Sequence, residues 1–501
     1  MIRFTLCTHN SIAEKLVNVH LLTRDNQVIP SRVTVENGII TADADGHANF
    51  AICLLYDAGT AGRLMLQTSI LPRREEPYML SLELARHRIK SFLDLSENWS
   101  LFHLSEDNPA VQRWEESRSI FTKALVCTDQ KKANDLARKA LEISIDASER
   151  LAMAHAQILL HRRYATKVAS SSTLGVNIAS QRFDEPLRAL VSNTFDIVKI
   201  PMQWSDIEPE EGVFQWGEID RWVKWARDHK KHIIAGPLLD FTLIDGIPEW
   251  VKKTEHDYSL FRDKCYDHIE RVVQRYGAAV LFWNVASGLN LNRHVQLSLP
   301  NMVDLVRTAR LLVKQGRKES MVMIELAEPF SEFVATTQGA CNANVFLSRL
   351  SQEGVSLDAL GVQCLVGGHG GSETRDLMLM SAKLDEFLHV DFPIIISAFG
   401  APSKTIHENH GWWKSPWDEE RQERWTIQMF AIAMSKPFVD SLIWTDLYDY
   451  KTMSLPTAGL ISLAGKPRAV LAKLLAMRKR LSKPLGPLHL PKRKDASREN
   501  E

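Results

Sequence analysis

The chain has 501 residues, too many for one ordinary compact domain, although a barrel of roughly 300 residues with an appended module would account for them. Lys plus Arg and Asp plus Glu both number 61, so no excess of either charge points to nucleic acid or to an anionic membrane surface as a partner. The balance favours a neutral partner or substrate.

Cysteines and apolar stretches bear on where the chain works. The six cysteines are scattered, with no pair at metal-ligand spacing and no dense framework of the kind that small secreted domains use, so we expect reduced thiols. The first residues, MIRFTLCTHNSIAEK, contain no uninterrupted apolar segment, and no later stretch is apolar for the roughly 20 residues that a membrane span needs. The sequence predicts a soluble, cytoplasmic protein with no membrane partner.

Residues 1–72 are predicted to form a β-rich N-terminal module, and residues 73–165 a helical connecting segment. In the module, apolar runs such as SRVTVENGIITADA and RLMLQTSI alternate with polar turns, which indicates hairpins. In the second segment, apolar residues recur with a period of 3.6, which indicates long amphipathic helices. The module contains no Trp and only one Tyr, Tyr56, so we expect a docking or structural role for it rather than sugar binding.

Residues 173–480, which follow a Ser/Thr-rich junction, alternate strand-like runs with helical stretches. The eight runs are TLGVN, FDIVKI, KHIIAG, AVLFWNV, MVMIEL, LDALGVQCL, FPIIIS and DSLIWTD. Eight strands joined by helices predict an α/β fold with a (β/α)8 TIM barrel, whose chemistry belongs at the C-terminal ends of the strands. Residues 481–501 are predicted to be a charged tail, disordered at its end.

Several segments of this region carry a likeness in their order and spacing. They are FDIVKIPMQWSDIEPEEGVFQWGEIDRWVKWARDHKKHIIAG, GIPEWV, LDALGVQCL, and SLIWTD followed by AGLISLAGKPRAVLAKLL. In these segments residues 173–480 resemble glycoside hydrolase family 10, the endo-1,4-beta-xylanase family. The resemblance implies a barrel that binds a neutral carbohydrate, a β-glycan or an oligosaccharide, and that needs no cofactor.

The resemblance breaks at the catalytic positions. Retaining glycosidases need two carboxyl groups about 5.5 Å apart, one to protonate the leaving oxygen and one to attack the sugar carbon. The resemblance places Gly288 at the acid/base position and Ala398 at the nucleophile position. Because no Glu or Asp occurs between Trp283 and residue 300, a shifted alignment does not recover an acid. Both catalytic glutamates are thus replaced.

Three acids at other predicted strand ends are candidates for a relocated catalytic pair: Asp240, Glu325 and Asp446. A buried carboxyl group with a raised pKa can act as a general acid while a second one stays ionised. For any single one of the three, we favour a salt-bridged or loop-capping role. Lys199 is expected to pair with Glu325 or Asp240.

Six residues are candidates for sugar contacts: Gln203, Trp204, Trp250, Gln363, His369 and Trp444. Aromatic faces stack on sugar rings, and the resemblance implies that Trp444 lines the cleft. His369 lies in the glycine-rich loop VGGHGGSE, which either brings backbone and imidazole close to a ligand or is a flexible loop with a solvated His. No metal site is expected, because no second His or Cys stands at ligand spacing.

Three hypotheses for the function follow. The leading one is a xylanase-like barrel of carbohydrate metabolism that binds a polysaccharide or oligosaccharide without cleaving it, a pseudoenzyme. The alternative is an active glycoside hydrolase that uses relocated carboxylates such as Glu325 and Asp446. The third is a barrel with an interaction role and no sugar, since fold alone does not determine function.

Overall fold

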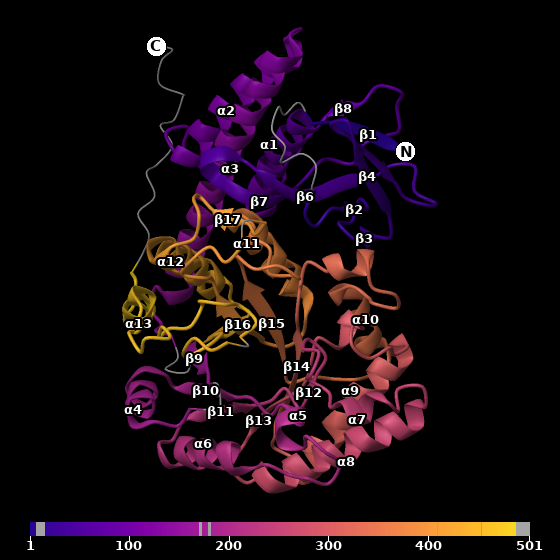
Figure 1. The fold of residues 1–501 in the computed structure, drawn as a ribbon. Helices are drawn as coiled ribbons and strands as arrows, with labels where there is room; N and C mark the ends of the chain where they lie inside the picture. Colours follow the sequence, from indigo (N-terminus) through magenta and orange to yellow (C-terminus); the bar gives the residue numbers. More distant parts are fainter. Residues whose placement is uncertain (7–15, 170–172, 179–181, 408, 452, 487–501) are drawn as a thin grey trace.

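Eight parallel strands close into a barrel in the computed structural model, which describes residues 1–6, 16–169, 173–178, 182–407, 409–451 and 453–486 (Figure 1). The strands are β9 (Leu174–Asn177), β10 (Ile197–Ile200), β11 (His232–Ala235), β13 (Phe282–Ser287), β14 (Met321–Leu326), β15 (Ala359–Leu365), β16 (Ile394–Gly400) and β18 (Val439–Trp444). Pairing of β18 with β9 and of β11 with β13 closes the ring, and β12 (Leu239–Asp240) continues the third strand. Each of the eight predicted runs overlaps one of these strands, which confirms the (β/α)8 barrel.

Helices surround the barrel on its outside. They are α4 (Glu185–Thr194), α6 (Gly217–Asp228), α8 (Tyr258–Tyr276), α9 (Leu299–Gly316), α10 (Ala343–Gln352), α11 (Leu377–Asp385), α12 (Glu419–Ser435) and α13 (Ala469–Leu481), with the short α5 (Trp204–Ile207) and α7 (Glu249–Lys252). Six of them begin after a Ser, Asp or Asn whose side chain accepts a backbone N–H of the first turn: Asp184, Asp257, Ser298, Asn342, Asp376 and Asp418. Such caps satisfy N–H groups that have no partner within the helix, so these residues fix where the helices start.

The barrel interior is filled by apolar side chains farther from the C-terminal ends of the strands and by polar side chains nearer those ends. Ile197, Ile234, Met323, Ile395 and Ile443, with Ala359, form a buried cluster of their own. Residues that alternate with them face the helices and belong to the large outer core. The barrel is therefore a packed core and not a channel, and polar chemistry is confined to the end where the strands finish.

The N-terminal part contains two small sheets. One has the strand order β4-β5-β1-β8, from β4 (Arg32–Glu36), β5 (Ile39–Asp43), β1 (Ile2–Thr5) and β8 (Tyr78–Met79). The other has the order β17-β7-β6-β2-β3, from β17 (Trp412–Trp413), β7 (Gly62–Gln67), β6 (Ala51–Asp57), β2 (His20–Leu22) and β3 (Val28–Ile29). Asn37 and Gly38 both have positive φ between β4 and β5, as a two-residue hairpin turn requires.

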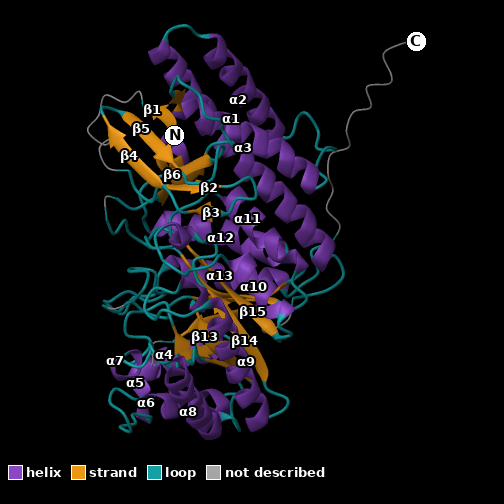
Figure 2. Ribbon diagram, turned by 90° about the vertical axis from the view of Figure 1, so that its right-hand side faces the viewer, coloured by secondary structure: helices purple, strands orange, loops and turns teal. Residues whose placement is uncertain are grey.

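Three helices follow the strands: α1 (Leu80–Asn98), α2 (Pro109–Val126) and α3 (Gln130–Tyr164). They pack against one another, and α3 continues along the barrel, where it contacts α11 and α12 (Figure 2). Within the described residues, no helix combines the length and the apolar character that crossing a bilayer requires. The described cysteines are free thiols, whereas Cys7 and residues 487–501 of the expected tail lie outside the described residues.

Candidate functional site

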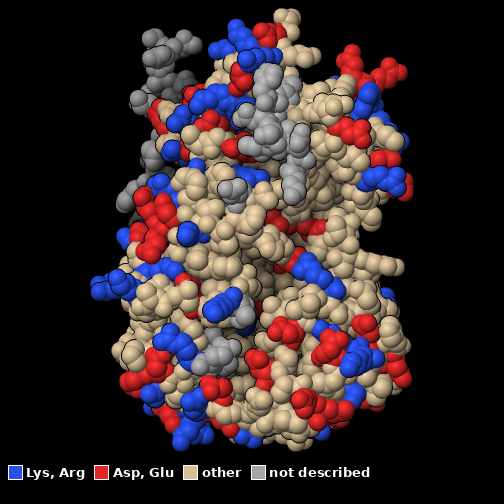
Figure 3. Space-filling model, viewed as in Figure 1, with Lys and Arg blue, Asp and Glu red and all other residues tan. Residues whose placement is uncertain are grey.

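The C-terminal ends of the barrel strands form the mouth of the barrel, where the candidate residues meet. Strand register places Asp240 beside Ser287, Ser287 beside Glu325, and Glu325 beside Gly361 on four neighbouring strands. In the space-filling view this side of the molecule is hollowed near its centre, below the N-terminal part, with acidic side chains at the edge of the hollow (Figure 3). A polar site at this end of the barrel is what the strand pattern predicts.

Lys199 and Glu325 form an ion pair across the inside of the barrel. Lys199 Nζ lies 2.6 Å from Glu325 Oε2 and 3.2 Å from the carbonyl oxygen of Ser397. These residues belong to β10, β14 and β16, which are not neighbours in the sheet, so the ammonium group sits inside the ring of strands. Ser287 Oγ and Gln363 Nε2 both donate to Glu325 Oε1, each at 2.8 Å. The expected pairing of Lys199 is confirmed, with Glu325 as the partner.

The surroundings of Glu325 keep its carboxylate ionised. Burial alone would raise its pKa, but the charge and hydrogen bond of Lys199, together with hydrogen bonds from neighbours such as Gln363, outweigh burial and lower the pKa to about 2. Both carboxylate oxygens already accept hydrogen bonds. Glu325 therefore has the environment of a permanently charged structural carboxylate rather than that of a proton donor.

Asp240 and Asp446 are buried carboxyl groups whose pKa values are raised, in contrast to the lowered pKa of Glu325. Burial raises the pKa of Asp240 to about 6, although the hydroxyl and the backbone N–H of Thr242 both donate to its Oδ1. Burial likewise raises the pKa of Asp446 to about 7, against the effect of hydrogen bonds from Tyr450 and Thr445. These two groups can hold a proton near neutral pH, which is the property that a general acid needs.

The position of Gly288 leaves no room for a side chain. Gly288 follows β13 with φ at +65°, a left-handed conformation that side-chain-bearing residues rarely adopt. A Cβ atom there would lie 2.6 Å from Thr242 Cγ2 and 3.0 Å from Leu291 Cδ1. The other substituted position, Ala398, pairs in register with Gln363 and is almost buried. A glutamate at 288 would thus have a strained backbone conformation, and the side chains of Thr242 and Leu291 would have to shift.

The tryptophans predicted to contact sugar differ in how accessible they are. Trp204 is buried, stacks on His268 with ring centroids 4.3 Å apart, and donates to Glu208. Trp444 is also buried and donates its indole N–H to the carbonyl of Ala458. Trp250 is half-buried and lies edge-on to Trp204. Of the three, only Trp250 has part of its ring in reach of solvent.

The polar residues predicted to contact sugar lie nearer the surface. Gln363 is half-buried while it donates to Glu325, and Gln203, also half-buried, donates to Ser205. His369 is exposed, and its ring centroid lies 5.2 Å from that of His410 in the next loop. Within the described part of the chain, no group of three or more His, Cys, Asp or Glu side chains is placed to hold a metal ion.

A second polar cluster, which the sequence interpretation missed, joins the N-terminal sheet to the loops of β14 and β15. Arg375 forms a buried ion pair with Glu332, and Asn18 Nδ2 donates to the other oxygen of Glu332 at 3.0 Å. Glu373 accepts from the backbone N–H groups of Gly370 and Gly371, at 3.1 and 2.9 Å. The loop VGGHGGSE is therefore organised by its final glutamate, whereas the sequence drew attention to His369.

Glu332 and Glu373 have divergent proton affinities. Burial and the neighbouring charge of Glu332 raise the pKa of Glu373 to about 8. For Glu332, burial is outweighed by the charges of Arg375 and His20, and its pKa is lowered. Glu373 therefore favours its protonated form near neutral pH, whereas Glu332 favours its charged form. The signal in the sequence is a glutamate two residues after the last of four glycines, but its partners lie far away in the chain.

Comparison with known proteins identifies relatives of the barrel. Residues 163–292 match the model of glycosyl hydrolase family 10, so the match contains Gly288 but not Ala398. The chain is 24% identical over 182 residues to endo-1,4-beta-xylanase 3 of Hypocrea jecorina, which covers 34% of this chain and 49% of the relative. It is 27% identical over 85 residues to endo-1,4-beta-xylanase B of Humicola insolens, covering 17% of this chain and 23% of the relative.

The chain thus spans about half or less of the length of these curated relatives. Among solved structures, GH10 from Paenibacillus barcinonensis is 16% identical and has a TM-score of 0.49. That likeness covers 64% of this chain and 97% of the other.

Proposed function

Because the barrel is related to glycosyl hydrolase family 10, we propose that this protein binds a β-linked polysaccharide or oligosaccharide at the barrel mouth and does not cleave it. The proposal rests on one observation above all, the buried Lys199–Glu325 ion pair inside the ring of strands. A retaining mechanism needs a free carboxylate oxygen to attack the sugar carbon. Both oxygens of Glu325 already accept hydrogen bonds from side chains on other strands.

The residues at the two replaced positions support the same proposal. Gly288 and Ala398 carry no group that can transfer a proton or attack carbon, and a side chain at 288 would be strained and would contact Thr242 and Leu291 too closely. Groups suited to hydroxyl recognition remain at the strand ends, namely the amides of Gln203 and Gln363, and the half-buried Trp250 lies on α7, which follows β12. Aromatic faces and amides are what neutral sugars require of a binding site.

The test combines binding and hydrolysis in the same samples. We expect xylohexaose and xylan to bind the full-length protein while no new reducing ends form at high protein concentration. Hydrolysis that survives purification and disappears in Glu325→Ala would refute the non-catalytic proposal. Absence of binding to xylan and to a panel of other β-glycans would refute carbohydrate recognition itself.

A second candidate function, glycoside hydrolysis by relocated carboxylates, is favoured by the divergent pKa values at the mouth. Asp446 has a pKa raised to about 7, whereas Glu325 has one lowered to about 2. One acid that holds its proton near neutral pH and one carboxylate that stays charged are the division of roles that glycosidases use. In that case Asp446 would protonate the leaving oxygen, and Glu325 would attack the sugar or activate water.

Matched variants separate the two functions. If Asp446 and Glu325 are the catalytic pair, Asp446→Asn and Glu325→Gln should both abolish the release of reducing ends. Asp440→Asn should leave the release of reducing ends unchanged. Asp440 is an exposed acid on β18, the strand that ends two residues before Asp446. Loss of hydrolysis in all three variants, or in none, would contradict this assignment.

We also propose a cytoplasmic location. The free thiols of Cys53, Cys127, Cys265, Cys341 and Cys364 suit a reducing compartment. Alkylation of these thiols in protein taken directly from cells, followed by mass measurement, would test this. Disulfide-linked cysteines in that material would contradict the proposal.

A further inference from the structure

The N-terminal part is attached to one side of the barrel mouth through three consecutive loops, which we call the walled rim: residues 327–342 after β14, 366–376 after β15, and 401–407 with 409–418 after β16. The first attachment is made by strand pairing. Trp412 and Trp413 of β17 pair antiparallel with Arg63 and Gly62 of β7, so that a loop of the barrel adds a strand to the N-terminal sheet (Figure 1).

The second attachment lies on the loop after β14. Val334 and Ala335 pack against a buried apolar cluster of the N-terminal sheet that contains Leu22, Val28 and Cys53. Beside this contact, Asn18 donates to Glu332, which is also paired with Arg375. Apolar burial and a satisfied polar network at one junction favour a single fixed arrangement.

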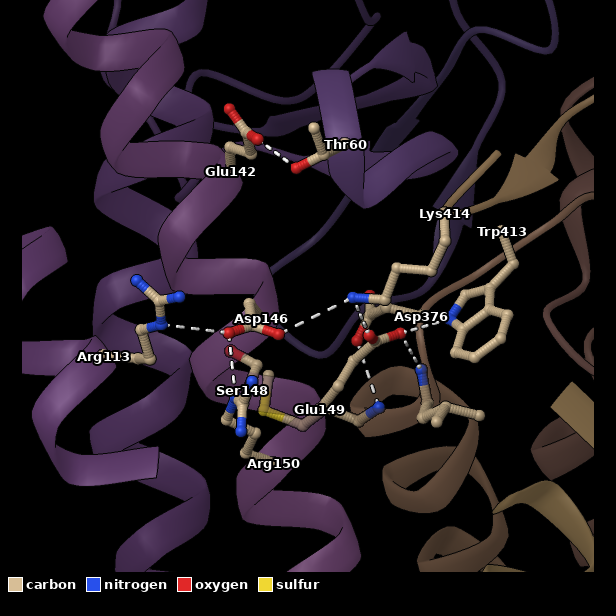
Figure 4. A network of polar contacts seen from close by, with 12 residues as sticks. Thr60, Arg113, Glu142, Asp146, Ser148, Glu149, Arg150, Asp376, Trp413 and Lys414 are labelled. Atoms are coloured by element: carbon tan, nitrogen blue, oxygen red, sulfur yellow. Dashed lines mark hydrogen bonds and ion pairs between the residues drawn. The ribbon is translucent and has the colours of Figure 1, made fainter. Parts of the chain in front are cut away.

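The third attachment joins the helices to the walled rim. Arg88 of α1 forms a buried two-pronged ion pair with Asp376, at 3.1 and 2.6 Å. Glu149 of α3 accepts from the indole of Trp413 and from Lys414, each at 2.6 Å, and Figure 4 shows these side chains converging from the helix and the barrel loops. Charge-assisted bonds of this kind hold their partners in place strongly. The N-terminal part is accordingly a fixed wall and not a loosely tethered module.

The wall stands opposite the strand that carries Lys199. In the closed strand order, β10 and β15 are separated by three strands on either side. A sugar chain laid across the mouth over Lys199 and Gln363 runs from the loop after β10 toward the walled rim. On this path a polymer would have to leave the mouth past the walled rim, where the N-terminal part is attached.

We infer that the mouth takes the end of a β-linked sugar chain, or a short oligosaccharide, and not an internal stretch of a polymer. This inference rests on the proposed carbohydrate binding and adds its specificity. The three attachments determine it, because they lie on one side of the mouth while the hollow itself stays open to solvent (Figure 3). If the protein recognises a chain end, the amount of protein bound depends on the molar concentration of chain ends and not on the mass concentration of polymer.

The experiment compares one β-1,4-xylan preparation before and after partial hydrolysis, at equal mass, with the full-length protein. If chain ends are bound, the mass concentration at half-saturation falls by the same factor as the mean chain length. An unchanged or higher half-saturating mass concentration would overturn the inference. If neither preparation nor xylohexaose binds, the proposed carbohydrate function itself fails, and the inference fails with it.

Two variants locate the binding. Gln363→Ala should weaken binding of both preparations, because Gln363 lies at the mouth. Gln352→Ala should leave it unchanged, because Gln352 is exposed at the end of α10. Equal binding by the wild type and by Gln363→Ala, in a variant whose unfolding midpoint is unchanged, would overturn the placement of the chain end at the mouth.

Discussion

The ammonium group of Lys199 lies 2.6 Å from Glu325 Oε2, and both side chains are almost completely buried inside the barrel. Removing two charges from water is costly, and the pair compensates only when its geometry is good and its other hydrogen bonds are satisfied. Here the carboxylate also accepts from Ser287 and Gln363. Replacing one member of the pair should consequently lower the free energy of unfolding much more than replacing both members together.

Lys199→Met is expected to destabilise the protein by about 3–5 kcal/mol, because it leaves the Glu325 carboxylate buried without a countercharge. Lys199→Met combined with Glu325→Gln should recover most of that loss, since no charge then remains and the amide oxygen still accepts from Ser287 and Gln363. Urea unfolding of the three proteins measures this. As a control, Arg317→Met removes an exposed pair with Glu319 and should cost less than about 1 kcal/mol. Additive losses in the double variant would contradict the coupling.

The stability contributed by Glu325 is expected to vanish in acid. Its folded-state pKa of about 2 lies below the ordinary value of 4.5, so the contribution is complete above pH 4.5 and is lost as the pH falls toward 2. The difference in unfolding midpoint between wild type and Glu325→Gln should therefore shrink over this range. Glu319→Gln, at an exposed site, serves as the control and should follow the wild type. A difference that stays constant down to pH 2.5 would show that the carboxylate is not held ionised.

Gly288→Ala should destabilise the barrel more than Gly354→Ala. Both glycines have similar positive φ, +65° and +69°, so the backbone cost of roughly 1–2 kcal/mol is shared. Only at 288 would the new Cβ also collide with Thr242, since nothing lies within 4 Å of the corresponding position at 354. Thermal or urea unfolding of the two variants gives the comparison. Equal losses would mean that the space around 288 adapts, and Gly288→Glu would then merit an assay for restored hydrolysis.

Glu373→Gln is expected to change its effect with pH. The folded-state pKa of Glu373, raised to about 8, lies above the ordinary 4.5, so its favourable contribution is complete below pH 4.5 and is lost as the pH rises through about 8. Gln imitates the protonated acid, so the variant should gain on the wild type between pH 6 and pH 9. Melting temperatures at these two values measure the gain. A constant difference would show that Glu373 is not the group that holds the proton.

Arg88→Met should weaken the attachment of the helices to the walled rim. Asp376 would then be buried without its ion-pair partner, although it would still accept from the backbone N–H groups of Met378 and Leu379 at the start of α11. A loss of about 3–5 kcal/mol in unfolding free energy is expected. Lys90→Met is the matched control, because Lys90 lies on the same helix but is exposed, and its pair with the exposed Asp94 stays within α1. Similar losses for both would show that Asp376 tolerates an unpaired charge.

The features that could be predicted from the sequence are mainly those that depend on residues close together in the chain. The eight strand runs are local patterns, and each of them overlaps a strand of the barrel. The pairing of Lys199 with Glu325 was within reach, because parallel strands bring their C-terminal ends together whatever the spacing along the chain. These features need only periodicity, turn chemistry and a known strand order.

The junction with the N-terminal part could not be predicted in the same way. Asn18 meets Glu332, and Arg88 meets Asp376, across separations of 314 and 288 residues, with no repeat or motif that marks either partner. The burial of Trp204 and Trp444 also depends on packing in three dimensions. The sequence pattern around a tryptophan at a strand end is the same for a side chain that faces a cleft and for one that faces a core. Burial of a specific side chain follows from all of its neighbours together.

The pairing of β17 with β7 has a consequence for how the chain is made. β7 ends at Gln67, but the strand that covers its edge begins at Trp412. During synthesis at roughly 5–20 residues per second, that edge waits on the order of tens of seconds before its partner leaves the ribosome. An uncovered edge strand can pair with another chain. During synthesis, the N-terminal sheet can thus associate with other chains until β17, which comes after the seventh barrel strand, has been made. A fragment that stops at residue 165 would keep the edge of β7 uncovered permanently.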